Sequence, residues 1–438
     1  MSWKTYYEQH TMSAQEAVKQ IRSGDRVVVG HACGEPGHVI DAMVANAQAY
    51  ANVEIVHLVA MGKAAYCAPG MERHFRHNAL FLGGPTRDAI AQGRGDFTPS
   101  FFFEIPGLFS STLPVDVALI QVTPPDENGQ CSLGISVDYT YEAVMKARTV
   151  IAQVNRNMPF TCGQSTVPVE KISCFVPCDE PILELAPPKI GPVEEAIGKN
   201  VASLVRDGDT LQLGIGAIPD AVLRFLGDKK DLGIHSEMFS DGVVDLIEAG
   251  VVTNRAKTLH PGKSVVAFLM GTKRLYDYVD HNSDVELRPV DYVNHPAVIA
   301  RNDNMVSINS CVQVDLMGQV CSESVGYKQI SGTGGQLDFV MGAYLSKGGK
   351  SFICLSSTVT GKDGTMKSRI VPTLTNGSIC TDPRSCVHYI VTEYGMVNLK
   401  GLSTWERAEA LISIAHPDFR EQLIADAEKM GIWRRSNK

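Results

Sequence analysis

The stretch Gly233-Ile-His-Ser-Glu237-Met-Phe-Ser240-Asp-Gly-Val-Val-Asp-Leu-Ile-Glu-Ala-Gly250 indicates an open α/β sheet. Residues 232–235 have the composition of a strand end, and Ser240 is a typical N-cap for an apolar-periodic helix that ends at Gly250. The pattern predicts Glu237 in the turn after a strand and before a helix, where open α/β sheets bind ligands. Its next two neighbours are large and apolar, which predicts a sheltered carboxylate able to act as a nucleophile.

The same local organisation occurs twice in the chain. Residues 13–30 and 194–214 each contain a helical pattern, a Gly-Asp turn and an apolar strand that ends in glycine. The second Gly-Asp turn follows the first by 184 residues, from Gly24 to Gly208. The sequence therefore predicts two tandem α/β domains. The alternative is that this common arrangement recurs without a duplicated domain.

A proline-rich segment marks the predicted boundary. Residues 186–192 contain three prolines, so we expect a first domain at 1–186, a linker at 187–192 and a second domain at 193–438. Apolar runs that alternate with helical patterns indicate mostly parallel sheets. These predicted strands are 116–122, 149–155, 264–271, 351–356 and 388–392. Residues 305–320 contain polar interruptions and a turn, which predicts antiparallel strands and a mixed second sheet.

Composition excludes several classes of protein. The 438 residues are 44% hydrophobic and 20% charged, with a net charge of −8, which argues against a nucleic-acid-binding protein. No apolar run reaches about 18 residues, and the N-terminus lacks a signal-peptide core, so we expect a cytoplasmic protein without a membrane span. The 11 cysteines and 12 histidines show no metal-binding spacing, so no metal is expected.

Two glycine-rich loops are candidate ligand sites. The segment 213–220, Leu-Gly-Ile-Gly-Ala-Ile-Pro-Asp, lies between a strand and a helix, where backbone N–H groups can hold an anion or a carbonyl oxygen. It resembles GxGxxG with proline at the third glycine, so dinucleotide binding is an alternative. The segment 331–339 has three glycines in four residues and can direct N–H groups at an oxyanion, or simply form a tight turn.

Three other segments are weaker candidates. Asn294 lies in a turn after the strand-like run 290–293, and its amide can donate a hydrogen bond or form a local turn. The loop 31–37 is the counterpart of the Gly214 loop in the first repeat, and we expect it to line a pocket for the acyl group. Lys273 and other basic residues of the second half can meet a polyanion, although a solvated surface is the commoner role for each.

Three motifs together resemble the acetyl-CoA hydrolase/transferase family, and the resemblance covers essentially the whole chain. They are residues 212–222, residues 235–245 with Glu237, and residues 332–339. The resemblance implies two tandem CoA-transferase α/β domains, with the active site between them. It also implies a ping-pong transfer of CoA between a four-carbon acyl-CoA, butyryl or 4-hydroxybutyryl, and acetate, through a glutamyl-CoA thioester.

The resemblance also implies roles for individual residues. Glu237 is the implied nucleophile, and Asn294 and Gly335 are the implied oxyanion donors. Coenzyme A is the expected substrate and covalent intermediate, with a short-chain acyl-CoA and a short carboxylate as partners and a homo-oligomer as the assembly. The expected contacts to coenzyme A are Gly214, Ile215, Gly216, Ala217, Ile218, Val312 and Gly335.

Two alternative functions stay open from the sequence alone. An acyl-CoA hydrolase would use the same glutamate and admit water to the intermediate. A dinucleotide-binding protein would use the Gly214 loop and form no covalent adduct.

Overall fold

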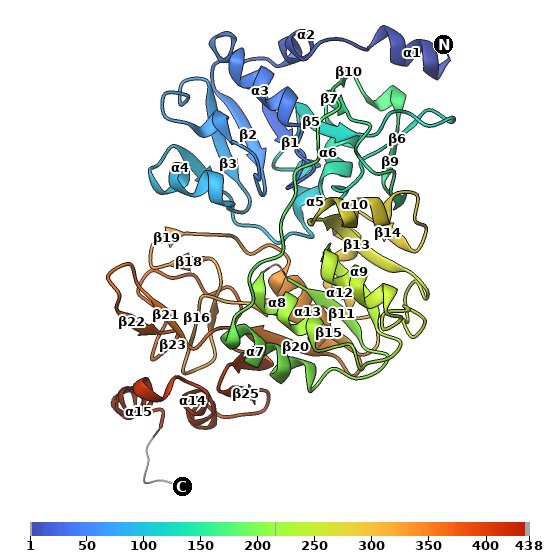
Figure 1. Cartoon of the computed structure of the whole chain (residues 1–438). Coiled ribbons are helices and arrows are strands. Elements are labelled where there is room, and N and C mark those ends of the chain that lie inside the picture. The colour runs from blue at the N-terminus through green and yellow to red at the C-terminus, as the bar shows by residue number, and fades with distance from the viewer. Residues whose placement is uncertain (1, 215, 434–438) are drawn as a thin grey trace. The chain divides into compact units, whose positions relative to one another are not determined.

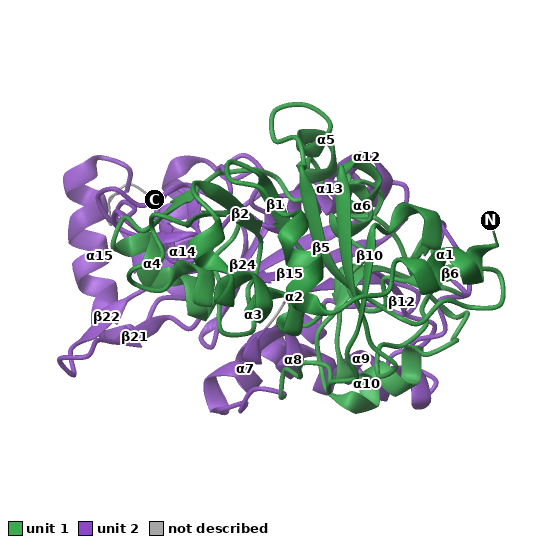
Figure 2. Cartoon of the chain, turned by 90° about the horizontal axis from the view of Figure 1, so that it is seen from above, with its two compact units in different colours: residues 1–186, 236–241, 263–295 green, residues 187–235, 242–262, 296–438 purple. Residues whose placement is uncertain are grey.

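A computed structural model describes residues 2–214 and 216–433 of the chain. The chain forms two compact units, and neither is contiguous in sequence (Figure 2). The first unit contains residues up to 186, 236–241 and 263–295, and the second contains 187–235, 242–262 and 296 onwards. The predicted tandem domains, 1–186 and 193–438, divide the chain differently and stay a prediction.

The first unit is built on a seven-stranded sheet in the order β10-β7-β5-β1-β2-β3-β4 (Figure 1). Every neighbouring pair in this sheet is parallel. All six residues of β5 are buried, as expected for a parallel sheet with both faces covered. The strands are β1 (Arg26–Val29), β2 (Val53–His57), β3 (Phe75–Ala79), β4 (Gly95–Phe97), β5 (Val117–Val122), β7 (Thr149–Val154) and β10 (Cys174–Pro177).

The helices of the first unit include α3, which contacts β7, and α6, which contacts β5. A second parallel ladder joins β13 (Ser264–Leu269), β14 (Val285–Leu287) and β8 (Cys162–Gly163). An antiparallel pair joins β6 (Gln130–Ser132) and β9 (Thr166–Pro168).

The helices of the first unit are α1 (Trp3–Gln9), α2 (Ala14–Ala17), α3 (Gly37–Ala45), α4 (Arg87–Ala91), α5 (Ile105–Phe109), α6 (Thr140–Lys146), α10 (Lys273–Val279) and α11 (Val290–Val293). Five short 3₁₀ helices lie at Val18–Gln20, Ala47–Ala49, Ala65–Cys67, Gly84–Thr86 and Val169–Lys171.

The second unit has its own mixed sheet, with β25-β24-β20-β15-β11-β12 as neighbours. All of these pairs are parallel except the edge pair of β24 and β25. The first three residues of β12 belong to this unit and the remainder to the first. The strands are β11 (Thr210–Leu213), β12 (Gly233–Phe239), β15 (Met305–Ser310), β20 (Lys350–Cys354), β24 (Tyr389–Thr392) and β25 (Gly395–Asn398).

Helices and small sheets complete the second unit. Helix α13 packs on β15 and β20, and an apolar cluster around Leu411 and Ile390 joins α14 and α15 to the sheet. The helices are α7 (Pro192–Ala202), α8 (Ala217–Arg224), α9 (Asp241–Glu248, whose first residue belongs to the first unit), α12 (Pro296–Ile299), α13 (Gln336–Leu345), α14 (Thr404–Ser413) and α15 (Pro417–Met430). The short strands are β16 (Gln313–Asp315), β17 (Val320–Cys321), β18 (Ser324–Val325), β19 (Lys328–Gln329), β21 (Thr358–Thr360), β22 (Met366–Ser368) and β23 (Ile370–Val371).

The two Gly-Asp turns of the predicted repeat have the same local structure. In the first, the Asp25 carboxylate accepts the Arg22 N–H at 2.8 Å, and in the second Asp209 accepts the Arg206 N–H at 2.9 Å. The preceding glycines have positive φ angles of 82° and 79°. Each turn leads into a strand that lies between two parallel neighbours. The repeated helix, turn and strand predicted from the sequence are therefore present in both units.

The sequence placed most strands correctly and missed two details. All five predicted apolar runs form strands, namely β5, β7, β13, β20 and β24. The antiparallel pair predicted within residues 305–320 is confirmed, because β16 and β17 pair around the turn at Gly318, but this pair lies in a small separate sheet. In the main sheet of the second unit, β15 is parallel to both neighbours and the antiparallel strand is β25. The predicted strand at 290–293 is wrong, because this segment is helix α11. The run Val-Asp-Tyr-Val is too short for its apolar pattern to distinguish a helical turn from a strand.

Within residues 2–214 and 216–433, no helix combines the length and apolar composition needed to cross a bilayer.

Gly24 allows a direct test of the turn that starts each repeat. A Cβ at Gly24 would meet no atom within 4 Å, so Gly24→Ala creates no steric clash. Its only effect is the backbone strain of an alanine held at a φ of 82°. We expect a loss of about 1–2 kcal/mol in the free energy of unfolding, measured by urea denaturation. Gly107→Ala is the control, since Gly107 lies in α5 with open space around it and should be neutral or stabilising by up to about 1 kcal/mol. Equal effects of the two changes would contradict the backbone argument.

Candidate active site

Glu237 lies inside a strand, close to its end, and not in the turn that the sequence predicted. Strand β12 continues from Gly233 to Phe239, and Glu237 is its only partly exposed residue. Met238 is 6% exposed and Phe239 is fully buried, so two buried apolar residues follow Glu237, as expected. The polar pair Ser236-Glu237 suggested a strand end because hydrophobic periodicity cannot follow a strand across polar residues.

Asn294 holds the carboxylate of Glu237. Its Nδ2 donates a hydrogen bond to Glu237 Oε2 at 2.7 Å, and both residues belong to the first unit. Asn294 is fully buried and forms the C-cap of α11. Its backbone N–H donates to Val290 O, and the Val290 N–H donates to Asp138 O, so the helix that positions the amide is itself anchored. The structure thus joins two candidates that are 57 residues apart.

A second contact fixes the chain where it leaves β12. Asp241 accepts hydrogen bonds from the Thr272 N–H at 2.9 Å and from the Thr272 hydroxyl at 2.5 Å. A Cβ at Gly271 would collide with the Asp241 carboxylate, so glycine is required there. In the sequence, Asp241 stands out only as a member of the motif at residues 235–245. The sequence offered one indication that Asp241 orients the end of β12, namely its position shortly after the strand that contains Glu237.

The Gly214 loop lies at the carboxyl end of β11 in the second unit. The Gly214 N–H donates to Ile308 O at 3.0 Å, and Gln212 and Asn309 exchange side-chain hydrogen bonds at 3.0 and 3.1 Å. Gly216, with a φ of 122°, precedes α8, which begins at Ala217 and continues through Ile218. Pro219 falls in the first turn of α8, where its missing N–H has no intrahelical partner to lose. Ile215 lies outside the described residues.

Val312 and Gly335 belong to the same sheet edge of the second unit. Val312 follows the carboxyl end of β15, which pairs in parallel with β11, and Gly335 is the N-cap of α13, which packs on β15 and β20. A helix that connects parallel strands runs antiparallel to them, so its N-terminus lies at their carboxyl edge. Val312 uses both backbone groups within the protein, because its N–H donates to Cys321 O and its carbonyl accepts from Arg369 Nε. We therefore expect its ligand contacts to come from the side chain.

A buried polar network that the sequence did not reveal supports the Gly335 loop. Gln336 Nε2 donates to Asp382 Oδ2 at 2.6 Å and to Ser322 Oγ at 2.7 Å. Glu323 accepts N–H groups from residues 330 and 331 through its backbone carbonyl, and its side chain accepts from Thr333. Asp382 is fully buried, and this burial raises its pKa to about 7, although the bond from Gln336 lowers it. Asp382 is 46 residues from Gln336, so only the fold brings them together.

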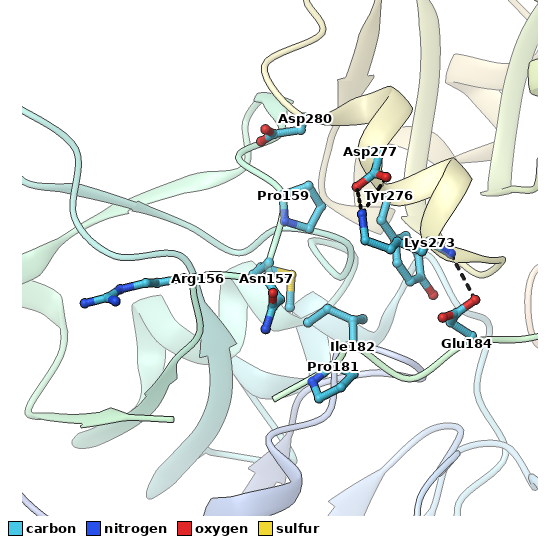
Figure 3. A pocket seen from close by; sticks show the side chains of 11 residues that line it. Arg156, Asn157, Pro159, Pro181, Ile182, Glu184, Lys273, Tyr276, Asp277 and Asp280 are labelled. Atoms are coloured by element: carbon cyan, nitrogen blue, oxygen red, sulfur yellow. Dashed lines mark hydrogen bonds and ion pairs between the residues drawn. The ribbon is translucent and has the colours of Figure 1, made fainter. Parts of the chain in front are cut away.

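The positive charges of two lysines that were candidates for binding a polyanion are partly neutralised by neighbouring carboxylates. Lys273 lines a cavity of about 480 Å³ in the first unit together with Arg156 and Tyr276, and its Nζ contacts both oxygens of Asp277 at 2.6 Å (Figure 3). In the second unit, Lys350 pairs with Asp209 at 3.2 Å. These pairs reduce the charge that either lysine offers to a phosphate.

The loop 31–37 borders a smaller cavity of the first unit. Glu35 is 5% exposed, lines a cavity of about 260 Å³, and accepts the Met61 N–H at 3.0 Å. Burial raises the pKa of its carboxyl group. His31 is buried and contacts Asp138 at 3.0 Å. The proposed role of this loop in an acyl pocket stays a prediction.

The chain is similar to proteins of one family over nearly its whole length. Residues 1–187 match the acetyl-CoA hydrolase/transferase N-terminal domain, and residues 271–427 match the C-terminal domain of the same family. A 4-hydroxybutyrate coenzyme A transferase of Clostridium kluyveri is 59% identical, with 98% of this chain and 100% of that protein covered. A butyryl-CoA:acetate CoA-transferase of Anaerostipes caccae is 46% identical, with both chains fully covered. The crystal structure of a 4-hydroxybutyrate CoA-transferase from Porphyromonas gingivalis has a TM-score of 0.84 at 43% identity, with 98% and 100% coverage.

The raised pKa of Asp382 predicts a specific pH dependence of stability. The folded state favours the protonated carboxyl, so the native protein binds more protons than the unfolded chain between pH 3.8, the ordinary pKa of an aspartic acid, and about pH 7. The contribution of Asp382 to the free energy of unfolding should therefore fall as pH rises through this window. Asp382→Asn removes the titration while keeping an oxygen for Gln336.

Melting temperatures of the wild type and of Asp382→Asn, measured between pH 5 and pH 8, test this expectation. The difference between them should shift in favour of the variant as pH rises. A difference that is independent of pH would contradict the assignment.

Proposed function

The chain is a CoA-transferase that belongs to the acetyl-CoA hydrolase/transferase family, and we propose that it transfers CoA between a four-carbon acyl-CoA and acetate through a thioester on Glu237. The observation that carries the proposal is the 2.7 Å hydrogen bond from buried Asn294 to the carboxylate of Glu237. A partly buried carboxylate that is oriented by one fixed donor meets the requirements of a nucleophile in acyl transfer.

The proposed reaction has two half-reactions. In the first, a Glu237 carboxylate oxygen attacks the acyl-CoA carbonyl, the carbon–sulfur bond breaks, and the products are an acyl-glutamyl anhydride and the CoA thiolate. The thiolate then attacks the glutamyl carbonyl, which releases the first acid as a carboxylate and leaves a glutamyl-CoA thioester. In the second half-reaction, acetate reverses these steps and leaves as acetyl-CoA. One thioester replaces another, so the exchange is balanced without an added oxidant or reductant.

Oxyanion stabilisation is the main physical demand of each step. Every attack converts a planar carbonyl into a tetrahedral centre with a negative oxygen, which fixed hydrogen-bond donors stabilise. We assign this role to the side-chain amide of Asn294 and to the backbone N–H of Gly335. The glycine loop at Gly214, with Gly216, Ala217 and Ile218, and the side chain of Val312 are the proposed contacts to CoA. The Gly335 loop suits its role because Gln336, Asp382 and Glu323 hold it in place.

The hydrolase alternative differs only in the fate of the intermediate. Water that reaches the anhydride or the thioester would release free acid and free CoA. Phe239 is fully buried and lies on the same face of β12 as Glu237, which favours exclusion of water and therefore transfer. Against the dinucleotide alternative, membership of this family supports coenzyme A as the ligand that we propose for the Gly214 loop.

We also propose which acyl group the enzyme transfers. The relatives named above act, by their names, on 4-hydroxybutyrate and on butyryl-CoA with acetate, and both acyl groups have four carbons. We propose the same substrate class for this chain. The cytoplasmic location and the homo-oligomeric assembly stay predictions.

Mass spectrometry of the intact protein tests the nucleophile. After incubation with butyryl-CoA without acetate, we expect a CoA adduct on the peptide that contains Glu237, and hydroxylamine should remove it. Glu237→Gln keeps the shape and loses the charge, so it should form no adduct and lose CoA transfer to acetate. Glu237→Asp withdraws the carboxylate by roughly 1 Å and should reduce the rate by on the order of 100-fold.

Glu127→Gln is the matched control, because Glu127 is exposed in a loop of the first unit. It should form the adduct at the wild-type rate. An adduct on Glu237→Gln, or full activity of that variant, would exclude Glu237 as the nucleophile. Release of free CoA from butyryl-CoA at the same rate with and without acetate would instead identify a hydrolase.

Asn294→Ala tests the oxyanion role separately. Loss of one donor of this kind typically costs about 3 kcal/mol of transition-state stabilisation, so we expect kcat to fall roughly 100-fold with a small change in KM. Asn294→Asp should be at least as damaging, because it places a second carboxylate against Glu237. Asn128→Ala, at an exposed turn, is the control. An Asn294→Ala enzyme with an unchanged kcat would remove this residue from the mechanism.

A further inference from the structure

Three side chains with metal-binding atoms converge in the first unit, outside the motifs that indicate CoA chemistry. A ring nitrogen of His38, Sγ of Cys178 and a carboxylate oxygen of Glu180 all lie within 4.8 Å of one another. His38 and Cys178 are partly buried, and Glu180 is exposed. His38 is 140 residues from Cys178, so the sequence contained no metal-binding spacing to detect.

The backbone around His38 is fixed. His38 lies in the first turn of α3, and its N–H donates to Gln153 Oε1 at 3.0 Å. Gln153 belongs to β7 and is 1% exposed. The histidine ring therefore projects from a helix that is tied to the central sheet.

The segment with the other two side chains is fixed at the same sheet. Cys178 directly follows β10, and its N–H donates to Val154 O at 2.9 Å. The carbonyl of Glu180 accepts hydrogen bonds from Asn155 Nδ2 at 2.7 Å and from Asn157 Nδ2 at 3.0 Å. Rigid main-chain supports of this kind lower the entropy cost of assembling ligands around an ion.

The cavity beside the cluster has an acidic wall, which is an independent indication of a cation. Glu180 lines the cavity of about 260 Å³ together with Glu35 and Asp41. Lys63 also lines it, and its Nζ already pairs with Asp41 at 2.7 Å. Lys63 offsets Asp41, and burial raises the pKa of Glu35, so Glu180 is the carboxylate of this wall that favours a cation.

We propose that His38, Cys178 and Glu180 bind a divalent cation of the Zn²⁺ class, with a fourth position for water. Imidazole, thiolate and carboxylate together suit borderline ions such as Zn²⁺ and Co²⁺, whereas Mg²⁺ and Ca²⁺ prefer oxygen ligands alone. Three protein ligands with one open position are a common arrangement for zinc in enzymes.

The three ligand atoms need to move only slightly closer together to bind one ion. Bonds of about 2.0–2.3 Å in a tetrahedral site place ligand atoms roughly 3.3–3.8 Å apart, so the three atoms need to approach by about 1 Å. Rotations of the Glu180 and His38 side chains supply this movement, since neither is fully packed. On binding, the Cys178 S–H bond breaks, the sulfur bonds to the cation, and the proton passes to water. Thiolate and carboxylate then balance the two positive charges of the ion.

Titration of the full-length protein with Co²⁺, followed by displacement with Zn²⁺, tests the site. The wild type should bind one equivalent of Co²⁺ with a near-ultraviolet thiolate-to-cobalt band, and Zn²⁺ should remove the band. Cys178→Ser should lose the band and bind at least about 100-fold more weakly, beyond the roughly 10–100-fold typical of losing an outer-shell partner. Glu180→Gln should weaken binding at least tenfold, and because Glu180 is exposed this variant tests the site without a folding defect.

Cys380→Ser is the matched control, because Cys380 is an exposed thiol of the second unit. It should keep the band and the wild-type affinity. A wild-type protein without the band, or Cys178→Ser and Glu180→Gln variants that bind like the wild type, would overturn the proposal. Loss of the band in Cys380→Ser alone would assign the cation to a different thiol.

Discussion

The hydrogen bond from Asn294 to Glu237 is the interaction on which the proposed chemistry depends. A carboxylate is a weak nucleophile in water, and complete burial would favour its neutral form. The protein places Glu237 near the end of a strand whose other residues are buried, and supplies one fixed donor to its oxygen. The carboxylate therefore stays oriented while its apolar neighbours limit contact with water.

The precision of that bond comes from several weaker contacts. Helix α11 is a single turn and has little intrinsic stability, but the Val290 N–H ties it to Asp138. Just beyond the carboxyl end of β12, Asp241 ties the chain to Thr272, and Gly271 leaves the space for that contact. The strand of Glu237 and the helix of Asn294 thus each have their own support, which suits the proposed reaction because a displacement of about 1 Å is costly there.

The second unit uses buried polar groups for a comparable purpose. A glycine loop that presents N–H groups to a ligand has no side chains of its own to hold its shape. Hydrogen bonds supply that support, because Thr333 donates to Glu323 and Gln336 donates to Asp382. Burial of Asp382 raises its pKa, and this is the cost of placing a carboxyl group where it can accept from Gln336. The same principle operates at Gln212 and Asn309, which fix the strands on either side of Gly214.

The sequence by itself determined the α/β class, the repeated Gly-Asp turns and the main strands, and it predicted Glu237 as the catalytic acid. These features depend on local periodicity and on residue types with strict conformational roles, such as glycine at positive φ. It did not determine that β12 runs past Glu237, that residues 290–293 are helical, or that Asp382 supports the Gly335 loop. Only the tertiary structure decided these features, and it alone brought His38 to Cys178 and Asn294 to Glu237. The physical reason is that side chains far apart in sequence meet only through sheet order and helix packing, which local patterns do not encode.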